Sequence, residues 1–188
     1  MSSTPLYPSD YLRVLQNTFT TDKVNNFLTT PGASTPIFLF GPSMLPSVLK
    51  SIIEADSNFN MVEKMAPCAA LNHRLYTMNG SCLPVIKPST EAGITVEGFV
   101  VFGLTAEQRN RLQDFESGLA RYEIVQVEIP LHDGLTRETR TFDAGAFVWG
   151  DTLVGLTASS SRFWKIDDFL GSRLYSSMVR SAARRNLP

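Results

Sequence analysis

Short apolar runs separated by turn residues dominate the middle of the chain. Residues 36–41 form a continuous apolar run that ends at Gly41, which is typical of a buried strand. Further extended segments are expected at 67–78, 83–87, 94–103, 121–131 and 138–149, with turn signals at Asn79-Gly80 and His132-Asp133-Gly134. The segments do not alternate with helices as βαβ units do. The pattern therefore predicts an α+β protein with a compact β core, a barrel, and peripheral helices.

Helical periodicity occurs around this core and at one point within it. The expected helices are one that starts at a Ser9-Asp10 cap and reaches Phe19, one over 22–28, one over 47–55, one from Thr105 to Gly118, and one that starts near Ile166. The helix from Thr105 has the clearest start, because Thr105 and Gln108 form a capping-box pattern. In the last helix, the apolar positions at helical spacing are expected to face the core rather than a ligand; they are Ile166, Phe169, Leu170, Leu174 and Met178.

These elements divide the chain into three parts. Residues 1–35 are expected to be an N-terminal helical extension, residues 36–150 the barrel domain, and residues 151–188 a C-terminal helix packed on the barrel. A length of 188 residues is in the range of one domain.

Composition excludes several classes of protein. A net charge of −1 argues against a nucleic-acid binder, and no apolar run approaches the length of a membrane span. Two cysteines and two histidines leave little for a metal cluster or a disulfide framework, so we expect no metal and no cofactor. Cys68 and Cys82 are expected to be reduced thiols. No signal peptide is evident at the start of the chain, which favours a cytoplasmic protein.

The charge is unevenly distributed. From Arg162 onward there are six basic and two acidic residues, whereas residues 1–161 carry 11 basic and 16 acidic residues. We expect a helix with a solvated basic face that docks on an acidic body. Binding to RNA or to an anionic membrane is the less favoured alternative, because no aromatic residues lie among the terminal arginines.

Three stretches together resemble the gamma-glutamylcyclotransferase-like family, including its plant branch named for avirulence-induced genes. The first runs from Phe38 to Leu49 and contains an aromatic-Gly-x-x-Met loop followed by Pro-x-Val-Leu. The second comprises residues 69–75 and 83–88. The third and strongest runs from Val96-Glu-Gly98 through the predicted helix to Glu116 and Tyr122. Their order and spacing cover roughly residues 36–150.

The resemblance implies a small mixed β-barrel of five to seven strands with helices around it. Enzymes of the family cyclise a gamma-glutamyl amide and release 5-oxoproline and an amine, without a cofactor. The resemblance also implies that Glu116 is the general base and acid. The substrate-binding residues that it implies are Phe40, Gly41, Pro42, Ser43, Met44 and Tyr122. The expected partner is a small gamma-glutamyl amine or amino acid, bound by a monomer or homodimer.

Elementary electrostatics is compatible with this role for Glu116. The residue lies near the C-terminal end of the helix that starts at Thr105, where unpaired carbonyl groups disfavour a negative charge. The neighbouring apolar residues Phe115, Leu119 and Tyr122 would desolvate the carboxylate in the same direction. From the residues alone, a solvated glutamate at a helix end is the commoner outcome; the resemblance favours the catalytic one.

The chain departs from the family pattern at four positions. Pro42 replaces the usual Ser or Thr and removes one backbone donor from the loop. Ser43 occupies a Leu or Asn position, Leu83 replaces a frequent Tyr, and Gln113 replaces an Asp. These departures motivate two alternatives. One is a family member recruited to another cyclisation, lyase or isomerisation step in specialised metabolism; the other is a non-catalytic binding protein.

Overall fold

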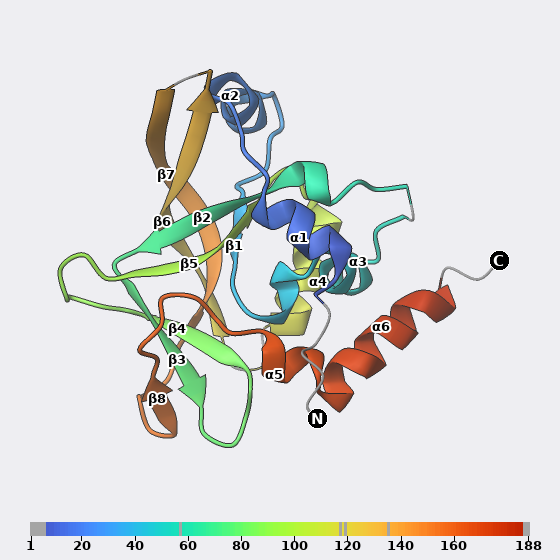
Figure 1. Cartoon of the computed structure of the whole chain (residues 1–188), viewed down its shortest axis with the longest axis vertical. Helices are drawn as coiled ribbons and strands as arrows, with labels where there is room; N and C mark the ends of the chain where they lie inside the picture. The colour runs from blue at the N-terminus through green and yellow to red at the C-terminus, as the bar shows by residue number, and fades with distance from the viewer. Residues whose placement is uncertain (1–6, 57, 117, 119, 135, 186–188) are drawn as a thin grey trace.

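A closed barrel of five strands forms the centre of the molecule (Figure 1). The computed structural model describes residues 7–56, 58–116, 118, 120–134 and 136–185; for 136, 137 and 180–185 it describes the backbone only. The barrel strands are β1 (Ile37–Leu39), β2 (Met65–Leu71), β5 (Thr95–Val101), β6 (Ala120–Asp133) and β7 (Thr136–Trp149). Their order around the barrel is β1-β5-β2-β6-β7.

The barrel is mixed because its closing seam is parallel. The pairs β1–β5, β5–β2, β2–β6 and β6–β7 are antiparallel, whereas β1 meets β7 in parallel at Ile37 and Gly145. The Gly145 N–H donates to the Pro36 carbonyl at 2.8 Å and secures this seam. The expectation of a small mixed barrel is confirmed.

A second, three-stranded sheet flanks the barrel in the order β4-β3-β8. It consists of β3 (His73–Met78), β4 (Pro84–Pro88) and β8 (Leu156–Ala158). The single extended segment expected at 67–78 is wrong, because Asn72 interrupts it with a φ of 56° and divides it between the two sheets. Asparagine tolerates this left-handed conformation better than most residues.

Two N-terminal helices, α1 (Ser9–Leu15) and α2 (Thr21–Thr29), pack on the barrel. Tyr11 and Val14 of α1 and Val24 of α2 are buried. The expected cap at Ser9-Asp10 is wrong: Pro8 holds the N-cap position, and no side chain caps α1. Helix α2 is capped by Thr20, whose side chain accepts a hydrogen bond from the Lys23 N–H.

Two further helices bring candidate site residues to one end of the barrel. After β1, the short 3-10 helix η1 (Pro42–Met44) leads into α3 (Pro46–Ile52), and a second 3-10 helix, η2 (Val62–Lys64), precedes β2. Helix α4 (Ala106–Glu116) starts with the expected capping box: the Thr105 N–H donates to Gln108 at 3.0 Å, and the Gln108 N–H donates to Thr105 at 3.2 Å. It ends at Glu116, two residues before Gly118.

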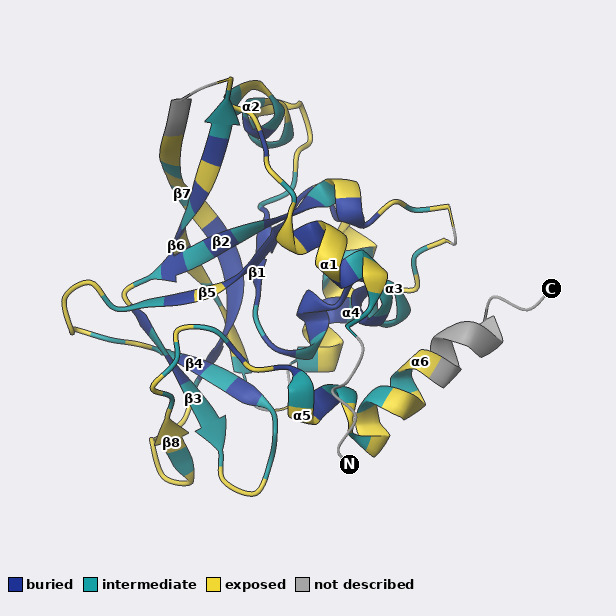
Figure 2. Ribbon diagram, viewed as in Figure 1, coloured by how far each residue is buried: buried dark blue, intermediate teal, exposed yellow. Residues whose placement is uncertain are grey.

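The single C-terminal helix expected from Ile166 is wrong, because the structure has two. Helix α5 (Asp167–Leu170) ends at Gly171, and α6 (Arg173–Arg185) then projects away from the barrel beside α3 (Figure 1). Ile166 and Phe169 are buried as expected, whereas Leu174 is exposed. Exposed positions occur along the described part of α6 (Figure 2). The packing of α5 and of the start of α6 is apolar and aromatic, with ring contacts from Phe169 to Trp164 and Tyr175.

The docking of the basic C-terminal residues on an acidic body stays a prediction, because three of these six basic side chains lie outside the described ones. The ion pairs among the described side chains are Arg74–Glu91, Arg111–Glu54, Arg111–Glu107 and Arg121–Glu123, and none of them involves α5 or α6. The arginines at 180, 184 and 185 lie outside the described side chains. Within the described range, none of the helices has the length and apolar character needed to cross a bilayer.

Candidate active site

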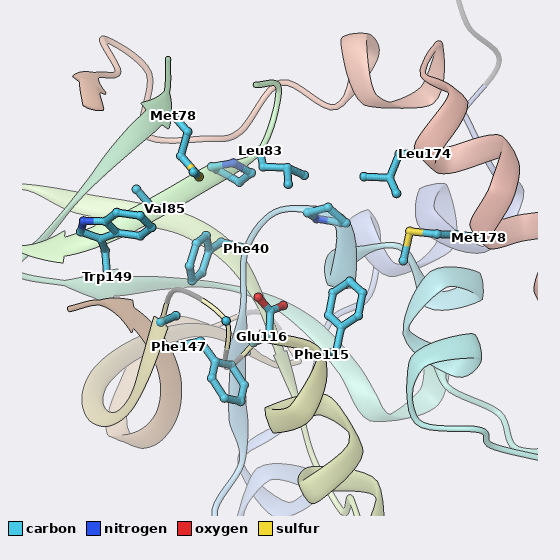
Figure 3. Close-up of a pocket in the computed structure, with 14 residues that line it drawn as sticks. Phe40, Met78, Leu83, Val85, Phe115, Glu116, Phe147, Trp149, Leu174 and Met178 are labelled. Atoms are coloured by element: carbon cyan, nitrogen blue, oxygen red, sulfur yellow. The ribbon is translucent and has the colours of Figure 1, made fainter. Parts of the chain in front are cut away.

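A pocket of about 190 Å³ opens at the end of the barrel where β1, α4 and β7 finish and β6 begins (Figure 3). Its volume exceeds the roughly 150 Å³ of an engineered apolar cavity that holds benzene. The lining residues come from elements far apart in the sequence: Phe40, Pro42, Met78, Leu83, Pro84, Val85, Phe115, Glu116, Gly118, Ala120, Phe147, Trp149, Leu174 and Met178.

The loop after β1 forms one edge of the pocket. Gly41 has a φ of 83°, which favours glycine, and a β-carbon at this position would lie 2.8 Å from a ring carbon of Pro84. The turn then closes through η1, in which the Met44 and Leu45 N–H groups donate to the Gly41 and Pro42 carbonyls. Phe40 and Pro42, on either side of Gly41, both line the pocket.

Two buried backbone donors of this loop have no acceptor among the described residues. They are the N–H groups of Gly41 and Ser43. Buried backbone N–H groups are almost always paired with protein, water or a ligand. Neither Gly41 nor Ser43 is among the described lining residues, but both adjoin Pro42, which lines the pocket, and the Ser43 hydroxyl contacts Glu116. Their N–H groups are therefore candidate donors of this loop, whereas Pro42 has none.

Glu116 is the last residue of α4, and its carboxylate points into the pocket (Figure 3). The Ser43 hydroxyl donates a long hydrogen bond of 3.4 Å to Glu116 Oε1. Burial raises the pKa of Glu116 from 4.5 to about 7, and the hydrogen bond from Ser43 opposes this rise. A carboxyl group with a pKa near neutrality can both accept and return a proton.

The walls around Glu116 are almost entirely apolar. Among the 14 lining residues that the structure describes, Glu116 alone has an ionisable side chain. Phe40, Phe147 and Trp149 pack on one side of it, and the Trp149 indole N–H is turned to the Thr152 carbonyl at 3.0 Å. These apolar walls are what desolvates the carboxylate.

Helix α6 supplies two lining residues that the sequence pattern assigned to the core. Leu174 and Met178, one helical turn apart, lie on the other side of Glu116 from Phe40 and Trp149, near Phe115 (Figure 3). Their spacing is the same for core and pocket positions, so the sequence pattern could not separate the two. For Trp149, at the end of an extended segment, the sequence favours packing in the core over a place at the mouth of the pocket. The structure places it in the pocket lining.

The structure brings together only part of the set expected to bind substrate. Phe40 and Pro42 line the pocket, Ser43 contacts Glu116, and Gly41 is covered by Pro84. Met44 is fully buried in the core and is not among the described lining residues.

Tyr122 also lies outside the described lining and is 39% exposed on β6. Its ring covers Gly145, in the space where a β-carbon would otherwise lie, and meets the edge of Phe147 at 5.8 Å between ring centroids. Tyr122 therefore contacts Phe147, which lines the pocket, without being among the described lining residues itself.

The cysteines and histidines lie away from the pocket lining. Cys68 and Cys82 are free, and burial raises the pKa of Cys68 well above its usual value. The Nδ1 atom of the buried His73 ring is 2.7 Å from the Leu71 carbonyl. Within the described ranges, no three His, Cys, Asp or Glu side chains are grouped so that they could hold a metal ion.

The family model described as gamma-glutamyl cyclotransferase, AIG2-like, matches residues 37–165, from the first residue of β1 to just before α5. The chain therefore belongs to the gamma-glutamyl cyclotransferase, AIG2-like family. No curated protein sequence matches it significantly.

Solved structures are similar to the chain at low sequence identity. One solution structure of an Arabidopsis thaliana protein is 18% identical, has a TM-score of 0.50, and matches over 80% of this chain and 80% of its own. Another Arabidopsis thaliana solution structure is 16% identical, with a TM-score of 0.48, over 82% of this chain and 94% of its own. A crystal structure of an uncharacterized human protein is 14% identical, with a TM-score of 0.44, and matches over 81% of this chain and 79% of its own.

Proposed function

We propose that the protein is a cofactor-independent enzyme that cyclises a gamma-glutamyl amide to 5-oxoproline and a free amine, with Glu116 as the proton shuttle. The observation that supports this most directly is the Glu116 carboxyl, raised to a pKa of about 7 in an apolar pocket. The adjoining loop has two N–H groups without an acceptor among the described residues. Family membership supports the reaction class.

The substrate supplies its own nucleophile. Its α-amine attacks the γ-carbonyl, and because the attack is intramolecular, the protein mainly has to hold the folded-back conformer. At neutral pH the amine is an ammonium group and must first lose a proton. Glu116 accepts this proton and later donates it to the nitrogen of the departing amine as the amide bond breaks.

The loop between β1 and α3 stabilises negative charge in this scheme. The Gly41 and Ser43 N–H groups can donate to the substrate carboxylate or to the oxygen of the attacked carbonyl. Ser43 has a second role in this scheme, because its hydroxyl donates to Glu116 and so favours the ionised form of the carboxylate. Phe40 and Pro42 provide the apolar surface under the folded substrate.

The test is turnover by Glu116→Gln. We expect the variant to release 5-oxoproline about 10²–10⁴-fold more slowly than the wild type, the usual range for loss of a general base and acid. In the wild type, kcat/KM should rise with pH through about 7, because the ionised form of Glu116 accepts the proton. Both are measured by chromatography of 5-oxoproline from a panel of gamma-glutamyl amides.

Glu107→Gln, an exposed change on the same helix, is the matched control and should retain wild-type activity. Equal rates for Glu116→Gln and wild type would refute the shuttle. Absence of 5-oxoproline from every amide would refute the proposed reaction and favour one of the two alternatives: another cyclisation, lyase or isomerisation step, or a binding protein on this fold.

A further inference from the structure

We infer that the pocket selects gamma-glutamyl amides of apolar amines that carry no carboxylate, and that Phe115, Leu174 and Met178 bind the apolar part of the amine. This inference rests on the proposed function, of which it names the substrate class. We call these three side chains the rim.

The rim is apolar and open to solvent. Phe115 is 47% exposed and Leu174 is 46% exposed, while Met178 is half-buried. The opposite wall is closed, since Phe147 and Trp149 are buried. Exposed apolar side chains beside a reactive carboxylate gain free energy when a ligand covers them.

The position of Glu116 divides the pocket between the two halves of a substrate. Its carboxylate lies between the closed wall with Phe40 and Trp149 and the rim (Figure 3). The glutamyl half must lie against the loop at 40–44, where the Gly41 and Ser43 N–H groups are. The amine is the first product to be released, so it must lie at the open side of the pocket. The rim is this open side.

The charge of the lining determines the class of amine. Among the described lining residues no lysine or arginine is present, so these residues offer no cation to an amine that carries its own carboxylate. That carboxylate would also approach Glu116, and two like charges in an apolar site destabilise each other. An apolar amine without a carboxylate avoids both costs.

The reaction balances without another reactant. The α-nitrogen forms a bond to the γ-carbonyl carbon, the bond from that carbon to the amine nitrogen breaks, and the electron pair stays on the leaving nitrogen. The α-nitrogen loses two protons as it passes from ammonium to lactam N–H; Glu116 takes them one at a time and passes both to the leaving nitrogen, which departs as an ammonium group. The products are 5-oxoproline and the apolar amine, and no water is consumed.

Three amides test the inference stepwise: those of glycine, leucine and 3-methylbutylamine. The leucine and 3-methylbutyl amides differ only in the carboxylate, and the glycine and leucine amides differ only in the apolar side chain. We expect kcat/KM to increase from the glycine amide to the leucine amide and again to the 3-methylbutyl amide, by about 10-fold or more at each step.

Substitutions in the rim locate the preference. Leu174→Gln and Met178→Gln keep the length of the side chain and the helix propensity while removing apolar surface. In the double variant, the ratio of kcat/KM for the 3-methylbutyl amide to that for the glycine amide should fall about 10-fold. Val179→Gln is the matched control, because Val179 is exposed on the same helix but does not line the pocket, and it should preserve the ratio.

The outcomes separate the two proposals. Turnover of the glycine amide equal to or better than that of the 3-methylbutyl amide would overturn the inference and leave the proposed function intact. A ratio that is unchanged in the rim variants would also overturn it. If no amide is turned over, the proposed function fails. Binding can then be measured without turnover, by calorimetry with the Glu116→Gln variant. Equal affinities for the 3-methylbutyl and glycine amides would show that the pocket does not prefer an apolar amine.

Discussion

The carboxyl of Glu116 lowers the stability of the fold at the pH at which it is proposed to act. In the unfolded chain it ionises near 4.5, whereas in the folded protein it keeps its proton up to about 7. Between these values the folded state binds more protons, so the free energy of unfolding falls as the pH rises through this window. Below about 4.5 the penalty is absent.

Glu116→Gln should therefore stabilise the protein at alkaline pH. A shift from 4.5 to about 7 corresponds to about 3 kcal/mol at most, and because the side chain is half-buried, solvent reduces this to about 1–3 kcal/mol at pH 8. At pH 4 the variant and the wild type should be equally stable. Urea unfolding at pH 4, 6 and 8 measures this, and a stability difference that does not vary with pH would contradict it.

At the scale of residues, the sequence predicted the direction of the pKa shift of Glu116 but assigned its cause only in part. It named the helix end and the neighbours Phe115 and Tyr122, whereas the pocket walls come from distant strands and from α6. Tyr122 is turned to Gly145 instead. Contacts of this kind depend on strand register across the barrel, which local spacing does not determine.

Among the elements, α4 matters most, because it carries Glu116 at its C-terminal end. Its only buried residue among the described ones is Leu112, so few core contacts hold the helix. The reciprocal hydrogen bonds of Thr105 and Gln108 therefore contribute a large share of its local stability.

Removal of this cap should loosen the site together with the helix. We expect Thr105→Ala to lower the free energy of unfolding by about 1 kcal/mol. Thr105→Ser, which keeps the hydroxyl, should cost much less. Chemical denaturation of both variants provides the measurement, and equal losses for Ala and Ser would show that the hydroxyl does not act as a cap.

Element boundaries show where the sequence pattern was insufficient. The capping box, the turn at Gly134 and the buried strand β1 were all predictable from local residue types. The break at Asn72 was not, because an asparagine within an apolar stretch does not by itself end a strand. The stop at Gly171 was missed for a similar reason: apolar residues continue at helical spacing beyond it.

On the scale of the whole molecule, the barrel requires close approach of β1 and β5. Gly98 of β5 lies where these strands cross: a β-carbon there would overlap the Leu39 carbonyl oxygen and lie 2.9 Å from the Phe38 ring. Only glycine leaves this space free. The approach also sets the end of β1, from which the loop at 40–44 starts.

Gly98→Ala should therefore destabilise the whole barrel by about 3 kcal/mol or more, because backbone and ring atoms must move together. Gly171→Ala is the contrasting change, since its β-carbon would meet only ordinary contacts at 3.8 Å, and we expect an effect within about 0.5 kcal/mol. Thermal unfolding of the two variants tests the difference. Similar melting temperatures would contradict the assigned crowding at Gly98.

The fold class was predictable from sequence, whereas the closing contacts of the barrel and of the site were not. Apolar runs and turns indicated a β core with helices, and the resemblance indicated a mixed barrel. The second sheet with β8, and the position of α6 beside Glu116, depend on packing between residues more than 50 positions apart. Local patterns carry little information about such pairs.

The parallel seam between Ile37 and Gly145 has a consequence for how the chain acquires its site. More than a hundred residues must be in place before β1 can join β7, and the entropic cost of closing so long a loop makes such contacts slow to form. The pocket needs still more of the chain, up to Met178. A nascent or partly refolded chain without α6 therefore has Glu116 but lacks Leu174 and Met178, two of the residues that line the pocket around it.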